Sequence, residues 1–489
     1  MALNRILLSI LLAAVASCSF AKPYPSLIRV SPATFVTGGT NITYVLNEAG
    51  STVTIEILNA GNAVVATFAG TAVRGDNTVH WDGTANNAGG AAIALGAYKV
   101  RITAASNVAA AWTEFSSNAA TDTVLTTVYK TLYPSFAPIS MLIQPAQTSD
   151  NFGKVVCLTG NTQTIATNPC QAGITLNGAL LTTDGTNGYA SRLLRGDLDP
   201  AIGNSGSEVD YWGACFDPTT TEGIWIASQA GANKGFYAAN SVADATTRLA
   251  DPTNITGGFP RSVAVRTEGA NKFAFFASGT NTINKIQIDS VSGNLTGAAT
   301  NIVSFADINR YGRKVKSDSA GNLYYGSRRN VSAGTGGALY RWSAAKVSAA
   351  PGTLLNEANA DWNIQLPAAS TNLSGPAITP AGDVYVYVCS DGIYTVGNAS
   401  TATLSKTLGA ADLVVPLVIS NNTFGNDIES DPAGNIIVNA IGTTAVANSQ
   451  AGFVRGFSPG GNSSMTVTAP SSQAINIAPT AAEDWALFR

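Results

Sequence analysis

Charged side chains are scarce in this sequence of 489 residues. Asp, Glu, Lys and Arg make up 12% of it, and the formal net charge is −3. A soluble domain usually carries roughly 25% charged residues. The sequence has no run of Lys and Arg of the kind that binds nucleic acids or anionic membrane surfaces. The composition therefore excludes the usual nucleic-acid-binding proteins. With 45% hydrophobic residues, the chain can still bury a large core.

Histidine is almost absent, because His80 is the only one. A catalytic triad, a metal site or a general base that needs histidine is therefore excluded outside the surroundings of this residue. His80 stands beside Trp81 in a strand-like segment, and we expect it on the solvent face of that strand. No cofactor is expected from such a sequence.

Long hydrophobic runs are missing after the first residues. Arg5 is followed by a short apolar stretch, which is typical of a signal peptide over residues 1–21 and too short for a permanent membrane helix. The small residues Ser19 and Ala21 favour cleavage after Ala21. The run Val15-Ala16-Ser17-Cys18 also resembles a bacterial lipobox, which would leave a lipidated Cys18. Either interpretation predicts a secreted or cell-surface protein.

Cysteine is rare as well. Four of the five cysteines follow the signal peptide. Cys157 and Cys170 are separated by loop-like sequence, and we expect a disulfide between them in an oxidising compartment. Cys215 and Cys389 lie in strand-like runs and are expected to be buried thiols. No C-x-x-C pair or Cys/His cluster indicates zinc.

The segment 29–105, after a short N-terminal segment 22–28, has the alternation of half-buried strands. Val53, Ile55 and Ile57 share one strand face, and turn residues separate the runs. Trp81 and Tyr98 are large enough to anchor the core of a β-sandwich. The sequence therefore predicts a small immunoglobulin-like β-sandwich, followed by a linker over residues 106–122.

The order of short motifs in this sandwich is distinctive. V-x-I-x-I, G-x-x-x-V-x-W-D-G, a Gly-Gly pair and L-G-x-Y-x-V-x-I follow one another over about 75 residues. In this order they resemble the FlgD-type immunoglobulin-like domain. The resemblance implies a rigid spacer or attachment module rather than a catalytic domain.

A sequence motif recurs through residues 123–489. It consists of Gly, Asn and Asp followed by a short apolar strand. The strand starts at Val155, Ile224, Phe273, Leu323, Val384, Ile436 and Trp485. These copies are spaced by 49 to 69 residues, which is typical of propeller blades. The pattern resembles NHL-like and YWTD-like propellers. It predicts an all-β protein with a β-propeller of seven blades, with six or eight as alternatives.

The last copy leaves no sequence for further strands of its blade. We therefore expect Thr123–Lys130 or Ile139–Ile143 to close the ring within the chain. The alternative is a strand donated by a neighbouring molecule, which would produce a polymer.

Carboxylate pairs are the main candidates for chemistry. The pairs Glu208 with Asp210, Asp197 with Asp199 and Asp427 with Glu429 are each two residues apart, so both members share a strand face if extended. Solvated turns explain them equally well. Asp197 and Asp199 are also candidate calcium ligands, although the spacing is not that of an EF-hand.

A second set of candidates lies eight positions before the repeated glycine or in an equivalent place. If the blades align, these side chains surround one mouth of the central channel, where they bind a ligand or hydrogen-bond between blades. They are Arg261, Arg313, Ser374, Asn426 and Asp210.

Three classes of function remain open. The first is a non-catalytic structural or adhesive protein that forms homo-oligomers or self-assembles into an extracellular fibre or layer, because neutral β surfaces associate readily. The second is a binding module whose propeller face holds carbohydrate or protein. The third is a secreted hydrolase or lyase that uses carboxylates.

Overall fold

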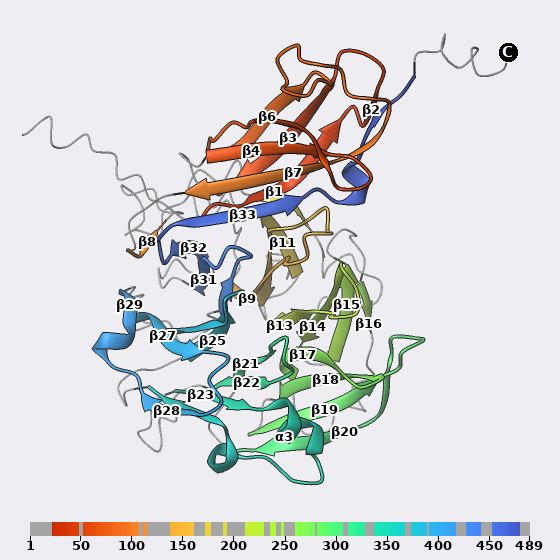
Figure 1. The fold of residues 1–489 in the computed structure, drawn as a ribbon. Coiled ribbons are helices and arrows are strands. Elements are labelled where there is room, and N and C mark those ends of the chain that lie inside the picture. The colour runs from red at the N-terminus through yellow and green to blue at the C-terminus, as the bar shows by residue number, and fades with distance from the viewer. Residues whose placement is uncertain are drawn as a thin grey trace, which may run out of the picture.

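The computed structural model consists almost wholly of short β-strands, which confirms the all-β fold class (Figure 1). One α-helix, α3 (Ala344–Ala349), occurs in the described residues, and none there is long and apolar enough to cross a membrane. The structure describes residues 22–47, 52–106, 111–114, 137–160, 172–177, 189–192, 211–228, 235–240, 246–248, 260–278, 281–306, 312–327, 337–366, 373–388, 391–416, 427–441 and 452–479.

Two sheets form a β-sandwich at the N-terminal end of the chain. The first sheet contains, in spatial order, β1 (Pro25–Ser31), β3 (Thr40–Leu46) and β6 (Gly75–Trp81). The second contains, in spatial order, β2 (Thr34–Phe35), β34 (Ile475–Ile477), β7 (Gly96–Ser106), β4 (Thr52–Leu58) and β5 (Val64–Ala69). A further strand, β33 (Ser463–Thr468), also pairs with β7.

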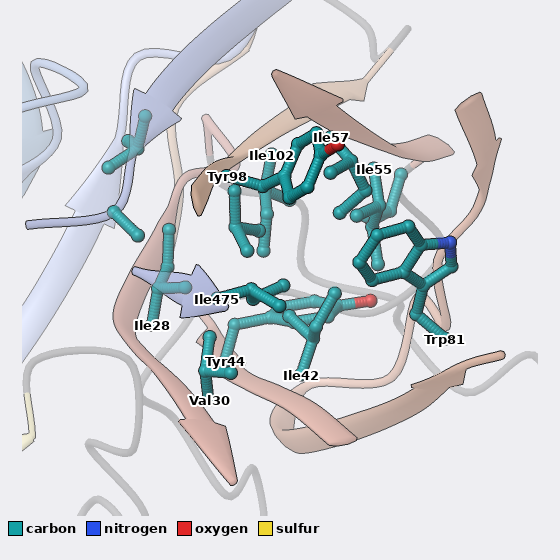
Figure 2. Close-up of a cluster of buried hydrophobic side chains, with 14 of the residues drawn as sticks. Ile28, Val30, Ile42, Tyr44, Ile55, Ile57, Trp81, Tyr98, Ile102 and Ile475 are labelled. Atoms are coloured by element: carbon teal, nitrogen blue, oxygen red, sulfur yellow. The ribbon is translucent and has the colours of Figure 1, made fainter. Parts of the chain in front are cut away.

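Alternating apolar side chains fill the space between these sheets (Figure 2). Ile55 and Ile57 of β4 are fully buried, as the alternation predicts. Trp81 contacts Tyr98 edge to face, with the ring centroids 6.3 Å apart. The Trp81 indole N–H donates to the carbonyl of Thr84 at 2.8 Å, so its one polar atom is satisfied. Both predicted anchors lie in the core.

The last described strands of the chain belong to the sandwich. β33 and β34 run antiparallel to the two halves of β7 and cover an edge of that strand. The hydroxyls of Thr103 and Thr466 lie 2.9 Å apart although the residues are 363 positions apart in the sequence. The range expected for the propeller, 123–489, therefore includes two strands of the sandwich.

The remaining strands form six sheets in the described part of the chain, one for each blade of a propeller. The innermost strands are β9 (Ala137–Ile143), β13 (Tyr211–Phe216), β17 (Pro260–Glu268), β21 (Gly312–Ser317), β25 (Leu373–Ile378) and β30 (Asp427–Ser430). The second strands are β10 (Lys154–Gly160), β14 (Gly223–Ser228), β18 (Asn271–Ser278), β22 (Leu323–Ser327), β26 (Asp383–Val388) and β31 (Ile436–Ile441).

Two outer strands complete each blade. The third strands are β11 (Ala172–Asn177), β15 (Gly235–Asn240), β19 (Thr282–Ile288), β23 (Ala338–Trp342), β27 (Gly392–Asn398) and β32 (Gly452–Ser458). The outermost strands are β12 (Tyr189–Arg192), β16 (Thr246–Arg248), β20 (Leu295–Ser304), β24 (Trp362–Gln365), β29 (Leu413–Pro416) and β8 (Thr113–Glu114). In the fourth blade, β28 (Leu404–Thr407) pairs with β24 as a fifth strand.

The repeated motif forms the turn before the second strand of each blade. Six of the seven expected strand starts lie in second strands, and the copy at Trp485 lies outside the described residues. Gly321 and Gly434 occupy these turns with φ of +79° and +84°, a conformation that glycine adopts without strain. The six described blades lie within the expected range of six to eight and are one fewer than the copies counted.

The ring closes within one chain, as expected, but through a strand that the sequence did not reveal. β8 pairs with β32 and completes the sixth blade, where Glu114 forms an ion pair with Arg455. The expected segment Ile139–Ile143 belongs instead to the inner strand of the first blade. Thr123–Lys130 lies outside the described residues. β8 lies in the expected linker 106–122, and its two residues are too few for a recognisable strand pattern.

The sandwich packs on the propeller through the N-terminal segment and the turn before β10. Tyr24 is fully buried and contacts Phe152 edge to face, with ring centroids 6.1 Å apart. The Arg29 guanidinium donates to the carbonyl oxygen of Asp150 at 2.6 Å. The N-terminal segment thus packs on its own chain.

Candidate functional site

The inner strands of neighbouring blades contact one another around the propeller axis. The strand registers place Lys314 of the fourth blade and Asp427 of the sixth at equivalent positions, three residues before the end of their strands. Lys316 and Glu429 follow two residues later. Because alternate residues of a strand share a face, two lysines and two carboxylates face the same central channel.

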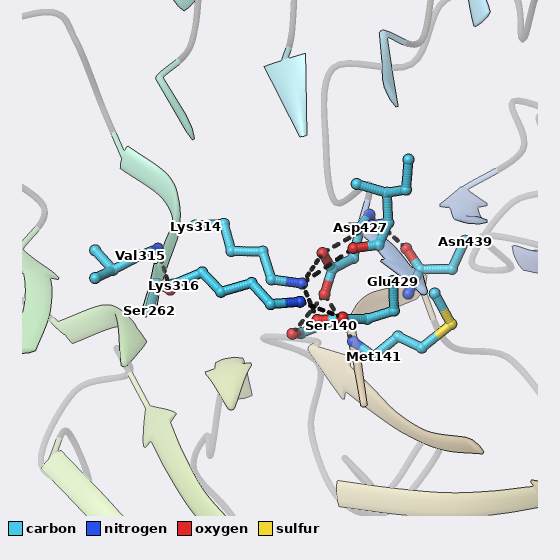
Figure 3. Close-up of polar contacts among 10 residues, drawn as sticks. Ser140, Met141, Ser262, Lys314, Val315, Lys316, Asp427, Glu429 and Asn439 are labelled. Carbon is cyan, nitrogen blue, oxygen red and sulfur yellow. Dashed lines mark hydrogen bonds and ion pairs between the residues drawn. The ribbon is translucent and has the colours of Figure 1, made fainter. Parts of the chain in front are cut away.

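These four residues form an ion-pair network, here called the channel cluster (Figure 3). The Lys314 Nζ lies 2.6 Å from Asp427 Oδ1 and 2.5 Å from Glu429 Oε1. The Lys316 Nζ lies 2.5 Å from Glu429 Oε2. The cluster links the fourth and sixth blades past the fifth, and its two positive and two negative charges balance.

Hydrogen bonds from the first blade complete the coordination of Asp427. Its Oδ2 accepts from the Ser140 hydroxyl and from the Met141 backbone N–H, each at 2.9 Å. Its own backbone N–H donates to the Asn439 side-chain oxygen at 2.7 Å. Burying these charges is compatible with a stable fold because each one is paired and hydrogen-bonded.

The pairing determines how the cluster ionises. Burial would raise the pKa of Glu429, but Lys314 and Lys316 outweigh it and lower that pKa. Burial would lower the pKa of Lys314, but Asp427 and Glu429 raise it. Burial lowers the pKa of Lys316, and Glu429 offsets this only in part. Glu429 therefore stays ionised near neutral pH and is unsuited to donate a proton as a general acid.

A cavity of about 300 Å³ lies against the channel cluster, toward the C-terminal ends of the inner strands. Lys314, Lys316 and Glu429 form its polar wall. The inner strand of every blade contributes at least one further lining residue, and these include Ile143, Phe216, Val265, Ser317, Ile378 and Ser430. The wall therefore combines apolar contact area with a few polar groups, which is typical of small-molecule sites.

A second hollow of about 470 Å³ continues over the turns of the fourth, fifth and sixth blades. Pro145, Lys316 and Ser430 are among the residues that line both spaces, so we call the two together the recess. The Lys316 side chain is 23% exposed, against 8% for Lys314. Within the described residues Lys316 donates only to Glu429, so two of its three ammonium protons remain for a ligand.

The predicted ring residues lie at the other end of the inner strands. Arg261, Arg313 and Ser374 are each the second residue of an inner strand, whereas the recess lies near the strand ends. The Arg261 guanidinium stacks over Trp212, 5.0 Å from the ring centroid. Asn426 and Asp210 lie outside the described residues. A ligand role for this set stays a prediction.

Several other candidates also fall outside the described part of the chain. They are Cys18, the side chains of Cys157 and Cys170, Cys389, and the pairs Glu208 with Asp210 and Asp197 with Asp199. The disulfide, lipidation and calcium sites therefore stay predictions. Cys215 is a free thiol that lines the recess, and burial raises its pKa, so it stays protonated. Across the described ranges no group of three or more His, Cys, Asp or Glu residues is arranged for a metal ion.

His80 lies on the solvent face of β6, as predicted, where its Nδ1 lies 3.0 Å from Asn41 Oδ1. The important residues that sequence reasoning missed are Lys314 and Lys316. Their signal was the K-V-K alternation on an inner strand, which matches the D-I-E alternation of Asp427 and Glu429 two blades later. Only the ring of blades brings these segments together.

Residues 31–107 match the family model of the FlgD Ig-like domain, which confirms the resemblance of the sandwich. No curated protein sequence matches the chain.

Many solved structures share parts of this fold at low similarity. A structural genomics protein of unknown function from Bacteroides thetaiotaomicron VPI-5482 is 10% identical with a TM-score of 0.35, covering 88% of this chain and 98% of that one. YCF48 bound to D1 peptide is 10% identical with a TM-score of 0.32, covering 66% and 94%. The Dos1 propeller is 9% identical with a TM-score of 0.28, covering 48% and 53%.

Proposed function

We propose that this chain is a secreted or cell-surface bacterial protein without catalytic activity, whose propeller binds carbohydrate or protein in the recess. The sandwich serves as its attachment module. One observation carries this proposal. The recess combines apolar lining residues with a polar wall, in which Lys316 keeps hydrogen-bond donors for a ligand. Sites of this composition bind ligands by apolar contact and orient them with few polar groups.

The channel cluster supports a binding role over hydrolysis. Asp427 and Glu429 lie on one strand face like the paired carboxylates of a glycosidase, but a lysine forms an ion pair with each of them. A hydrolase of this type needs one carboxyl group with a raised pKa, and Glu429 does not supply it because its pKa is lowered.

The test is a binding screen of the whole protein against soluble bacterial oligosaccharides and short peptides, read by isothermal titration calorimetry. Lys316→Met is expected to weaken binding of the selected probe by about tenfold or more, because a hydrogen bond to a charged group is lost. Lys99→Met, at an exposed lysine of the sandwich, is the matched control and is expected to bind normally.

Two results would contradict this proposal. One is a set of probes that all bind Lys316→Met as tightly as the native protein. The other is cleavage of a probe during the titration, which would favour the secreted hydrolase or lyase instead.

A self-assembling structural role is the second candidate, and β20 favours it. This outermost strand of the third blade contains no charged residue in its ten positions. Thr296, Gly297 and Ala298 are exposed, and among described residues its outer edge carries only an isolated bridge from Val303 to Leu355. Uncharged strand edges accept strands from other molecules. Negative-stain electron microscopy with light scattering is expected to show filaments or sheets for this role, and single particles would exclude it.

A further inference from the structure

The backbone of Lys22 lies in a polar socket between the sandwich and the sixth blade. Its nitrogen faces two acceptors, Asn435 Oδ1 at 3.0 Å and Ser458 Oγ at 3.1 Å. Its carbonyl oxygen accepts from the side-chain amides of Asn47 at 2.8 Å and Asn435 at 3.0 Å. Asn47, Asn435 and Ser458 are fully buried. With Asp431 they are called the N-terminal socket below.

The number of protons on this nitrogen matters. A peptide N–H has one proton, which Asn435 and Ser458 must share. An α-ammonium group has three, so it can donate fully to both acceptors and keep one more. Hydrogen bonds from a charged donor are also stronger than those from an amide. The socket therefore fits a chain terminus better than a peptide group.

The charge of the socket points the same way. Asp431 is 2% exposed and accepts from the Asn435 amide at 2.7 Å, but it forms no ion pair with any described residue. Burial raises its pKa to about 7. The buried hydroxyl of Tyr24 has no hydrogen-bond partner within the described part of the chain, and burial and the charge of Asp431 raise its pKa. The Lys22 side-chain ammonium lies at the same turn, near Gly434, but forms no ion pair with Asp431 among the described residues. A second ammonium group, on the Lys22 backbone nitrogen, would further offset the cost of burying the carboxylate.

We propose that the peptide bond between Ala21 and Lys22 is hydrolysed after export and that the freed α-ammonium group of Lys22 occupies the N-terminal socket. A peptidase outside the cytoplasm catalyses this hydrolysis. Water cleaves the peptide bond, so Ala21 leaves with the new carboxylate and Lys22 keeps the new amino group. Because Asn47 belongs to the sandwich and Asn435 to the sixth blade, processing strengthens the contact between the two domains. The inference rests on the proposed export and requires no ligand in the recess.

The first experiment is the intact mass of the full chain after expression and export in a bacterial host. The expected mass is that of a chain beginning at Lys22. A lipid-modified chain beginning at Cys18 would overturn the inference, because Lys22 would then remain a peptide group. A chain that retains residues 1–21 would contradict the export itself.

The second experiment tests the socket separately from export. One protein begins at Lys22 and the other carries Ala21 before it, each released from a cleavable fusion. The chain beginning at Lys22 is expected to unfold at least about 2 °C higher, which corresponds to a few charge-assisted hydrogen bonds. Equal midpoints would overturn the inference.

A pair of variants distinguishes a bound terminus from general packing. Ser458→Ala is expected to lower the unfolding midpoint more in the chain beginning at Lys22. The ammonium group of that chain loses a full hydrogen bond, whereas the single amide proton of the longer chain can go wholly to Asn435. Ser472→Ala is the matched control, since this exposed serine donates to Asp150 away from the socket. It is expected to shift both chains equally. Equal effects of Ser458→Ala would also overturn the inference.

Discussion

The sixth blade holds two buried acidic sites that differ in their partners. Glu429 in the channel cluster contacts two lysines, and its pKa is lowered. Asp431, two residues later, accepts hydrogen bonds from uncharged donors only, as far as the described residues extend, and burial raises its pKa to about 7. Burial is nearly the same at both sites, at 7% and 2% exposed. The nature of the partner, not the depth, therefore decides whether a carboxyl group in this propeller is ionised.

The same turn in the fourth blade extends this comparison. Asp318 accepts from the backbone and side chain of Asn322, as Asp431 does from Asn435. The remaining oxygen of Asn322 accepts from the Ala344 N–H at the start of α3, at 3.2 Å. In the sixth blade that place is taken by the Lys22 nitrogen. In both blades, the asparagine side-chain oxygen of this turn thus accepts a hydrogen bond from a neighbouring backbone nitrogen.

The largest expected effect comes from removing the cation of the channel cluster. Lys314→Met leaves Asp427 and one oxygen of Glu429 buried without their shared cation, and the free energy of unfolding is expected to fall by about 3–5 kcal/mol. Urea unfolding followed by tryptophan fluorescence measures it. Lys406→Met breaks a more exposed ion pair with Asp412 and is expected to cost less than about 1 kcal/mol. Similar losses for the two variants would contradict the importance of burial.

The two matched turns predict an intermediate effect. Asn435→Ala removes a fully buried amide that contacts Asp431 and Lys22, at an expected cost of about 1–3 kcal/mol. Asn322→Ala, at the partly exposed equivalent, is expected to cost less. The measurement is the difference between the two variants in urea unfolding. A greater loss for Asn322→Ala would show that the turn itself, and not its occupant, carries the stability.

A third way to test this comparison is the pH dependence of stability in the chain that carries Ala21. The native pKa of Asp431 is about 7, above its ordinary 3.8, so the native state keeps a proton that the unfolded chain loses. The stabilisation is complete below about pH 4 and is lost as the pH rises through 7. Asp431→Asn is expected to flatten the decline in unfolding free energy between pH 5 and 8. If the variant and the parent decline in parallel, Asp431 does not titrate in this range.

The parts of the fold that the sequence reveals depend on local patterns. The strand starts at Leu323 and Ile436 follow turns whose glycines need positive φ, so each copy carries its own signal. The alternation of Ile55 and Ile57 likewise fixes a strand face within a few residues. β33 and β8 carry no such signal. Each becomes part of its sheet by pairing with a strand that lies hundreds of positions away in the sequence.

The candidate site depends still more on distant contacts. The i, i+2 spacing of Asp427 and Glu429 correctly places both on one strand face. Nothing near them in the sequence indicates that Lys314 and Lys316 neutralise them, since the contact exists only after the blades form a ring. For the same reason, the predicted ligand residues Arg261 and Ser374 lie at the opposite end of the inner strands from the recess.

The return of β33 to β7 has a consequence for the order in which the chain is made and exported. Strands β1 to β7 emerge first, but an edge of β7 is covered only after the whole propeller has followed. Contacts so distant in sequence form late in folding. A chain interrupted within the propeller therefore presents an open strand edge on an otherwise finished sandwich, and such an edge promotes aggregation.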